Sequence, residues 1–158
     1  MTRFSASLAL LVLLLARPGI ADDTGPLAAV NTFFDAMAES DVTLARSVMV
    51  DDGILYGYIE SVDGLRLVRV SIGEFLAGWD NREDSLLERI WDVQVLTHDR
   101  LAVVWTPYDF FLNGEFHHCG VNNFNLIRSD AGWKITGVTY SMETATCEES
   151  PLGPPDFD

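Results

Sequence analysis

The chain has 158 residues, of which 24 are acidic and 10 basic, so its formal net charge is −14. This charge argues against a nucleic-acid partner, because binding to phosphates needs a basic surface. It also argues against an anionic membrane surface. The length suits one domain, and the solubility of an exported protein is a sufficient explanation for the acidic excess.

The N-terminal segment has the pattern of a secretory signal. Arg3 precedes an apolar run over residues 6–16, and Gly19 and Ala21 supply the small residues of a cleavage site. The apolar run is too short to span a bilayer as a stable helix. We therefore expect residues 1–21 to be removed and the protein to be secreted or periplasmic. An uncleaved N-terminal anchor is the alternative.

The mature chain would have one domain over residues 22–147 and an acidic, proline-rich tail over residues 148–158. The composition of the tail predicts disorder. Both cysteines, Cys119 and Cys147, lie in the mature chain, and in an oxidising compartment such a pair usually forms a disulfide. Two free thiols or a nucleophilic cysteine are the alternatives, although no positioned histidine supports a nucleophile.

The first half of the mature chain has helical and short β patterns. Apolar residues at three-and-four spacing predict an amphipathic helix of about 14 residues that starts with Pro26. Ser40-Asp41 ends this helix and caps a second one. The elements that follow the first helix are predicted as a helix over Val42–Met49, strands over Ile54–Glu60 and Leu65–Ser71, a short helix over Ile72–Trp79 and a strand over Leu86–Leu96.

Two turn signals divide residues 100–142 into three long antiparallel strands. Asn113-Gly114 is a two-residue hairpin turn, and residues 129–132 form a polar loop that contains a glycine. The predicted strands are Arg100–Leu112, Glu115–Arg128 and Trp133–Met142. Helices followed by such strands indicate an α+β domain in which the helices pack on one side of a curved antiparallel sheet.

This element order resembles the nuclear transport factor 2-like superfamily. The likeness rests on A-V-V-W-T-P-Y-D-F-F-L-N-G-E-F-H-H-C-G-V-N-N-F-N-L-I-R and on D-A-G-W-K-I-T-G-V-T-Y, and it extends over nearly the whole mature chain. Within the superfamily the chain is similar to SnoaL-like and lumazine-binding-like small secreted proteins. The resemblance implies a cone-shaped, cystatin-like fold with a pocket between sheet and helices, and a possible homodimer through the outer sheet face. It leaves open whether the chain is an enzyme, because one fold hosts many functions.

Regular strand pairing through the two turns predicts which side chains share the pocket face. Asp109 would lie opposite His118, and Trp105 opposite Asn122. The face would be apolar at one end and polar at the other, as in a ligand pocket. The predicted ligand-binding residues are Trp105, Asn122, Phe124, Thr139, Tyr56 and Trp79.

Asp109 and His118 are the candidate catalytic residues. A carboxylate bonded to an imidazole fixes its tautomer and raises its basicity, which suits proton abstraction or activation of water. A cross-strand salt bridge at the rim of the sheet is the alternative, and a one-residue bulge would separate the pair. His117 and His118 are neighbours on one strand and should point to opposite faces, so we expect no shared metal. The sequence contains no cofactor motif.

Three functions agree with these patterns. The leading hypothesis is an exported protein that binds a small apolar or aromatic molecule without assigned chemistry. The alternative is an isomerase, dehydratase or cyclase that uses Asp109 and His118. The third is an interaction module that exposes an apolar patch around Tyr108, Val121 and Tyr140 on the outer face.

Overall fold

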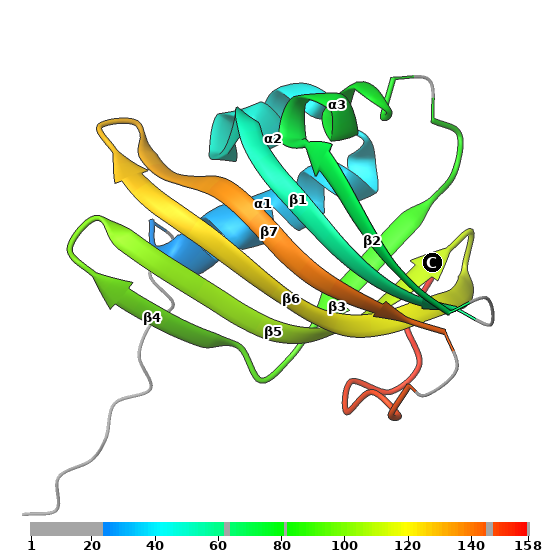
Figure 1. The fold of residues 1–158 in the computed structure, drawn as a ribbon. Helices are drawn as coiled ribbons and strands as arrows, with labels where there is room; N and C mark the ends of the chain where they lie inside the picture. The colour runs from blue at the N-terminus through cyan, green and yellow to red at the C-terminus, as the bar shows by residue number, and fades with distance from the viewer. Residues whose placement is uncertain (1–23, 62–63, 81, 145–146, 158) are drawn as a thin grey trace, which may run out of the picture.

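The computed structural model describes residues 24–61, 64–80, 82–144 and 147–157, so the predicted signal over residues 1–21 lies outside the described part. Within that part, three helices lie against one face of a curved, seven-stranded sheet (Figure 1). We call this the inner face and the opposite one the outer face. The elements are α1 (Pro26–Glu39), α2 (Val42–Val48), β1 (Met49–Ser61), β2 (Gly64–Ser71), α3 (Ile72–Ala77), β3 (Leu86–Ile90), β4 (Gln94–His98), β5 (Leu101–Leu112), β6 (Glu115–Ser129) and β7 (Gly132–Glu143).

The helices form where the local sequence predicts them. Asp41 caps α2, because its side chain accepts a hydrogen bond from the Leu44 amide at 2.9 Å. Ser71 and Glu74 form a reciprocal capping box at the start of α3. No helix in the described ranges has the length and apolar character needed to cross a bilayer.

Packing of α1 on the inner face creates the core. Phe33 and Phe34 meet the ring of Phe124 at centroid distances of 6.0 and 5.7 Å. Val30 of α1 and Ile135 of β7 are fully buried beside them. Burial of each such side chain contributes about 1.5–3 kcal/mol, so the apolar stripe of α1 fixes the helix across the sheet.

The strand order is β2-β1-β7-β6-β5-β3, and β4 also pairs with β5. All pairs are antiparallel except β1 with β7, so the predicted α+β class is confirmed but the sheet is mixed. Gly57 of β1 lies opposite Tyr140 of β7. A Cβ atom on Gly57 would stand 2.5 Å from the Tyr140 ring, so the glycine lets that ring lie across β1.

The pairing of β5 with β6 differs from the regular register after two residue pairs. Leu112 and Phe111 pair as predicted, but His117 is an extra residue in β6, so Asp109 lies opposite Cys119 and Phe110 opposite His118. A shift of one residue moves a side chain to the other face of a sheet. The predicted dyad of Asp109 and His118 is therefore wrong, because the two residues lie on opposite faces.

A second shift occurs between β6 and β7. The predicted register holds as far as Leu126 with Ile135, but Thr136 is extra, so Thr139 lies opposite Asn123 on the outer face. The predicted strand Leu86–Leu96 is also interrupted. Asp92, with a positive φ of 46°, separates β3 from β4.

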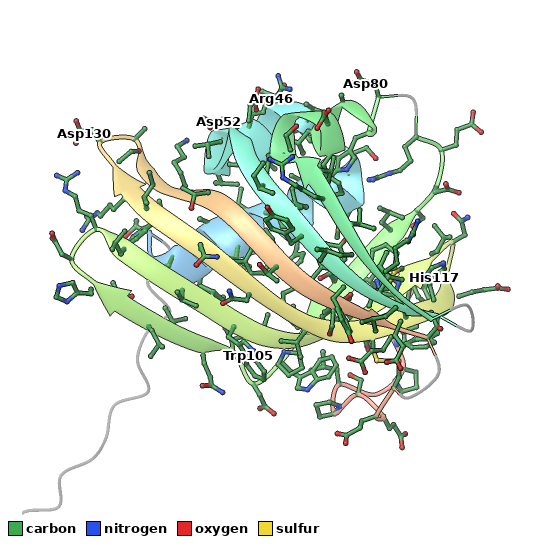
Figure 2. The ribbon with its side chains drawn as sticks, viewed as in Figure 1. Arg46, Asp52, Asp80, Trp105, His117 and Asp130 are labelled. Carbon is green, nitrogen blue, oxygen red and sulfur yellow. A yellow bond between two sulfur atoms is a disulfide. The ribbon has the colours of Figure 1, made fainter. Side chains whose placement is uncertain are left out.

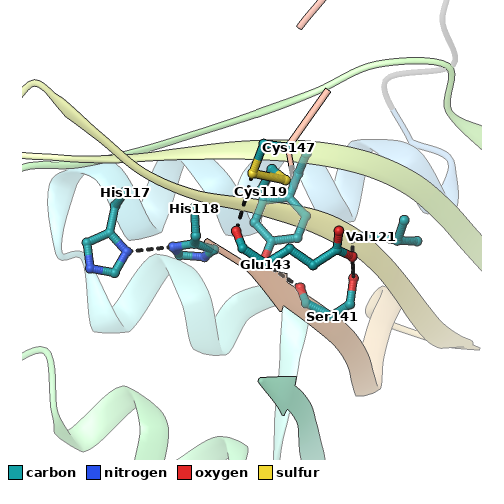
Figure 3. The surroundings of a disulfide bond; sticks show 8 residues. His117, His118, Cys119, Val121, Ser141, Glu143 and Cys147 are labelled. Carbon is teal, nitrogen blue, oxygen red and sulfur yellow. Dashed lines mark hydrogen bonds between the residues drawn. A yellow bond between two sulfur atoms is a disulfide. The ribbon is translucent and has the colours of Figure 1, made fainter. Parts of the chain in front are cut away.

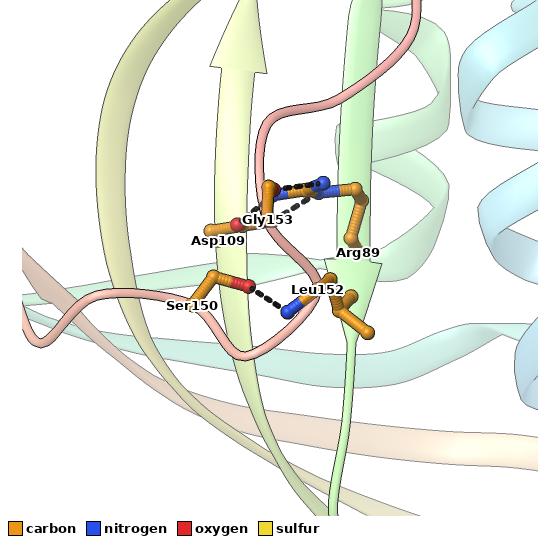
Figure 4. Close-up of polar contacts among 5 residues, drawn as sticks. All are labelled: Arg89, Asp109, Ser150, Leu152 and Gly153. Atoms are coloured by element: carbon orange, nitrogen blue, oxygen red, sulfur yellow. Dashed lines mark hydrogen bonds and ion pairs between the residues drawn. The ribbon is translucent and has the colours of Figure 1, made fainter.

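The C-terminal segment packs on the outer face and is tied there by the Cys119–Cys147 disulfide (Figure 3), which confirms the predicted pair. The disorder expected for residues 148–158 stays a prediction, and the described residues 147–157 contact the sheet. Arg89 donates a hydrogen bond to the Gly153 carbonyl at 2.9 Å (Figure 4), and the Phe157 ring lies 5.6 Å from that of Phe111. A covalent tether and an apolar contact thus join the tail to the sheet.

Candidate functional site

A cavity of about 270 Å³ lies between the inner face of the sheet and helices α1 and α3. Most of its wall is apolar, and its size is near the lower end for small-molecule sites. The apolar lining consists of Phe33, Met37, Leu55, Ile59, Phe75, Leu86, Phe110, Phe124, Val138 and Met142. The polar lining consists of Arg82, Glu88, Tyr108, His118, Asn122 and Tyr140.

Glu88 and Asn122 form the central polar contact of the cavity. The alternation of β3 turns Glu88 inward, opposite Phe110 of β5. The Asn122 side-chain amide donates a hydrogen bond to Glu88 Oε1 at 2.6 Å. Although the residue as a whole keeps partial solvent exposure, burial of its carboxyl group raises the pKa of Glu88 to about 8 against the pull of this hydrogen bond. Glu88 is therefore mostly neutral at pH 7 and able to donate a hydrogen bond.

Two tyrosines flank this carboxyl group. Tyr108 is 2% exposed, and its hydroxyl donates to the Ser141 carbonyl at 2.8 Å. Burial, with a smaller contribution from nearby Glu88, raises the pKa of both Tyr108 and Tyr140. The two phenols therefore stay protonated and give the cavity neutral hydroxyl groups.

His118 lies in the same wall but does not contact a carboxylate among the described residues. Its ring stacks on Phe110 at a centroid distance of 4.6 Å, and its Nδ1 lies 2.8 Å from Nδ1 of His117 (Figure 3). Burial, followed by the neighbouring His117, lowers the pKa of His118 to about 4. The bulge brings the two rings together, so the prediction that they point to opposite faces is wrong.

Asp109 lies on the outer face, where it is 4% exposed. Arg89 donates to both carboxylate oxygens, from Nε at 2.9 Å and from Nη2 at 2.5 Å (Figure 4). The tail backbone at Gly153 binds the same guanidinium. Asp109 is thus a structural ion-pair residue away from the cavity.

The structure brings together three of the residues predicted for the site: His118, Asn122 and Phe124. It separates the others from the cavity. Trp105 is 38% exposed and points away from the helices (Figure 2). Thr139 and Tyr56 also lie on the outer face, and Trp79 is a core residue between Phe33 and Phe75.

Sequence reasoning missed Glu88, Tyr108, Tyr140 and Arg82. A signal for Glu88 was present, because it shares one face of its strand with the apolar Leu86 and Ile90. The opposite face of that strand carries Arg89. The tyrosines were assigned to the outer face by the regular register, so the predicted apolar patch around them is wrong. The exposed outer face instead carries Leu96, Leu101, Trp105 and Ile127, and the homodimer through it stays a prediction.

Metal ligands do not gather in the described ranges, where no cluster of three or more His, Cys, Asp or Glu side chains has the geometry to hold an ion. The polar groups of the cavity are instead neutral hydrogen-bonding groups and one guanidinium. This arrangement can orient an apolar molecule by a few polar contacts.

Solved structures share this architecture at low sequence identity. A proposed dehydratase of the NTF2-like family from Streptomyces avermitilis superposes with a TM-score of 0.59 and 19% identity over 78% of this chain and 97% of that chain. An NTF2-like protein of unknown function from Pseudomonas putida superposes with a TM-score of 0.59 and 11% identity, over 79% of this chain and 93% of that chain. A protein of unknown function with a cystatin-like fold from Nostoc punctiforme superposes with a TM-score of 0.57 and 12% identity, over 80% of this chain and 91% of that chain.

These similarities establish the fold, which is the nuclear transport factor 2-like, or cystatin-like, α+β cone. The resemblance noted in the sequence is confirmed at the level of the superfamily fold. No family model matches the chain, and no curated protein matches it. A fold shared at such identities carries no activity with it.

Proposed function

We propose that the protein is an exported binding protein that holds a small apolar or aromatic molecule in the inner-face cavity. The observation that carries this proposal is the largely apolar cavity with the Glu88–Asn122 contact inside it. Apolar walls supply affinity and a few convergent polar groups supply orientation. The Cys119–Cys147 disulfide supports export, because such bonds persist in oxidising compartments.

Two neighbouring residues of β7 give a matched test. Val138 lines the cavity, whereas Thr139 is exposed on the outer face. Val138→Phe should fill the cavity and weaken binding of the neutral probe 2-naphthamide by at least about tenfold, while Thr139→Phe should leave it unchanged. Isothermal titration calorimetry measures both. Native mass spectrometry of the exported protein should also find a bound small molecule in wild type and lose it in Val138→Phe. Equal binding by wild type and Val138→Phe would contradict the proposal.

A second candidate function follows from Glu88. A carboxyl group whose pKa lies near 8 is suited to proton transfer at neutral pH, which an isomerase, dehydratase or cyclase would need. Glu88 takes the place of the discarded Asp109–His118 pair in this hypothesis. The protein should then speed exchange of the acidic C1 protons of 2-tetralone in D2O, followed by NMR, and Glu88→Gln should abolish the increase. If wild type exchanges these protons only at the rate of the buffer, the catalytic hypothesis is contradicted and the binding function remains.

A further inference from the structure

Arg82 is a fixed cation in the wall of the cavity. It follows α3, and its backbone amide donates to the Trp79 carbonyl at 3.2 Å. Its guanidinium carbon lies 5.1 Å from the centroid of the Trp79 ring. Nη2 donates to the Met37 carbonyl at 2.5 Å and to Ser40 Oγ at 2.9 Å, at the C-terminal end of α1. These contacts hold the guanidinium plane and thereby fix the direction of its other donors.

One of those donors is buried without a partner. Arg82 Nε is inaccessible to solvent and has no hydrogen-bond acceptor among the described residues. The ion pairs of the described ranges are Arg46–Asp51, Arg89–Asp109 and Arg100–Asp130, so the Arg82 cation has no carboxylate within 4.0 Å there. A buried N–H group that stays unpaired is costly and therefore rare in native proteins. Nε itself is out of reach of a water-sized group, but Arg82 lines the cavity, so a ligand there can meet the other donors of this guanidinium.

The charge balance of the cavity points to the same kind of ligand. Arg82 is the one cationic side chain in the lining, and Glu88, the one carboxyl group there, is mostly neutral at pH 7. The lining thus carries one cation and one mostly neutral carboxyl group, in a chain whose net charge is −14. A neutral Glu88 and the Asn122 amide leave an incoming anion without a repelling carboxylate in the lining.

We infer that the ligand of the cavity is an aromatic or otherwise apolar carboxylate, whose anionic oxygen accepts a hydrogen bond from the Arg82 guanidinium. This inference rests on the proposed binding function and names its ligand class. The apolar body would occupy the space lined by Phe33, Phe75 and Phe124. Hydrogen bonds between a guanidinium and a carboxylate are charge-assisted and stronger than neutral ones, so the acid should bind more tightly than its neutral analogues.

The test compares 2-naphthoate with 2-naphthamide, which has the same rings without the charge. Calorimetry at pH 7 should give wild-type protein an affinity for the acid at least about tenfold above that for the amide. Arg82→Gln should bring this ratio close to one and keep the affinity for the amide, which also shows that the variant is folded. Arg100→Gln removes an exposed arginine at the far hairpin and should leave the ratio unchanged.

Arg82→Lys serves where Arg82→Gln fails to fold, because lysine keeps the charge and can reach the α1 carbonyl but lacks the planar set of donors of a guanidinium. It should lower the ratio of the two affinities. Equal affinities for the acid and the amide in wild type, or an unchanged ratio in the Arg82 variants, would overturn this inference and leave the binding function standing. If neither probe binds, the binding function and the inference both fall.

Discussion

Glu88 and Asp109 are two acidic side chains on adjacent strands of the sheet, and they lie on opposite faces. Glu88 of β3 turns to the inner cavity and receives one hydrogen bond from the Asn122 amide. Asp109 of β5 turns to the outer face and receives two hydrogen bonds from the Arg89 guanidinium, under the tail. Both carboxyl groups are shielded from water, and their partners differ in charge.

The comparison shows that the partner decides what a shielded carboxyl group can do. An amide does not compensate the charge of an ionised carboxylate, so Glu88 keeps its proton to a higher pH. The protonated carboxyl group can then donate a hydrogen bond to a ligand. A guanidinium in bidentate contact compensates that charge and occupies both oxygens of Asp109. The inner acid is therefore suited to function and the outer acid to fixing the tail.

The largest expected effect comes from removing the compensating charge on the outer face. Arg89→Met leaves Asp109 shielded without its ion-pair partner, so we expect the free energy of unfolding at pH 7 to fall by about 3–5 kcal/mol. Urea denaturation followed by tryptophan fluorescence measures it. The double variant Arg89→Met with Asp109→Asn should recover a large part of the loss. An equally unstable double variant would show that the packing of Arg89 on Phe111, and not its charge, matters.

A smaller effect of opposite sign is expected on the inner face. The pKa of Glu88 is raised from 4.5 to about 8, so between these values the folded protein holds a proton that the unfolded chain has released. The contribution of this group to stability is complete below pH 4.5 and is lost as the pH rises to 8. Glu88→Gln removes this loss, so the variant should be more stable than wild type at pH 8.

This difference should shrink as the pH is lowered towards 4.5, and thermal denaturation at pH 5 and pH 8 would follow it. The exposed Glu115→Gln serves as the control and should show no comparable change with pH. His118 has the opposite effect on the pH dependence of stability. Its pKa is lowered from 6.5 to about 4, so its contribution to stability is complete above pH 6.5 and is lost as the pH falls towards 4. If Glu88→Gln differs from wild type in stability by the same amount at both pH values, Glu88 is not a neutral carboxyl group in the folded protein.

Much of the architecture could be predicted from local patterns. The apolar spacing after Pro26, the cap at Ser71 and the turn at Asn113-Gly114 are signals within a few residues of the element that they specify. The disulfide could be predicted because the chain has only two cysteines. The candidate site was predicted less completely, because Asn122, Phe124 and His118 were placed in the wall but their partners were not.

By itself, then, the sequence determined the order of helices and strands, the α+β class and the apolar side of the first helix, since each depends on neighbours along the chain. Tertiary structure alone decided which face each long strand presents to the cavity. The extra residues His117 and Thr136 shift β6 and β7 by one position. Side chains alternate with a period of two, so each shift exchanges inner for outer residues, and the contacts that accommodate a bulge come from other strands and from the tail.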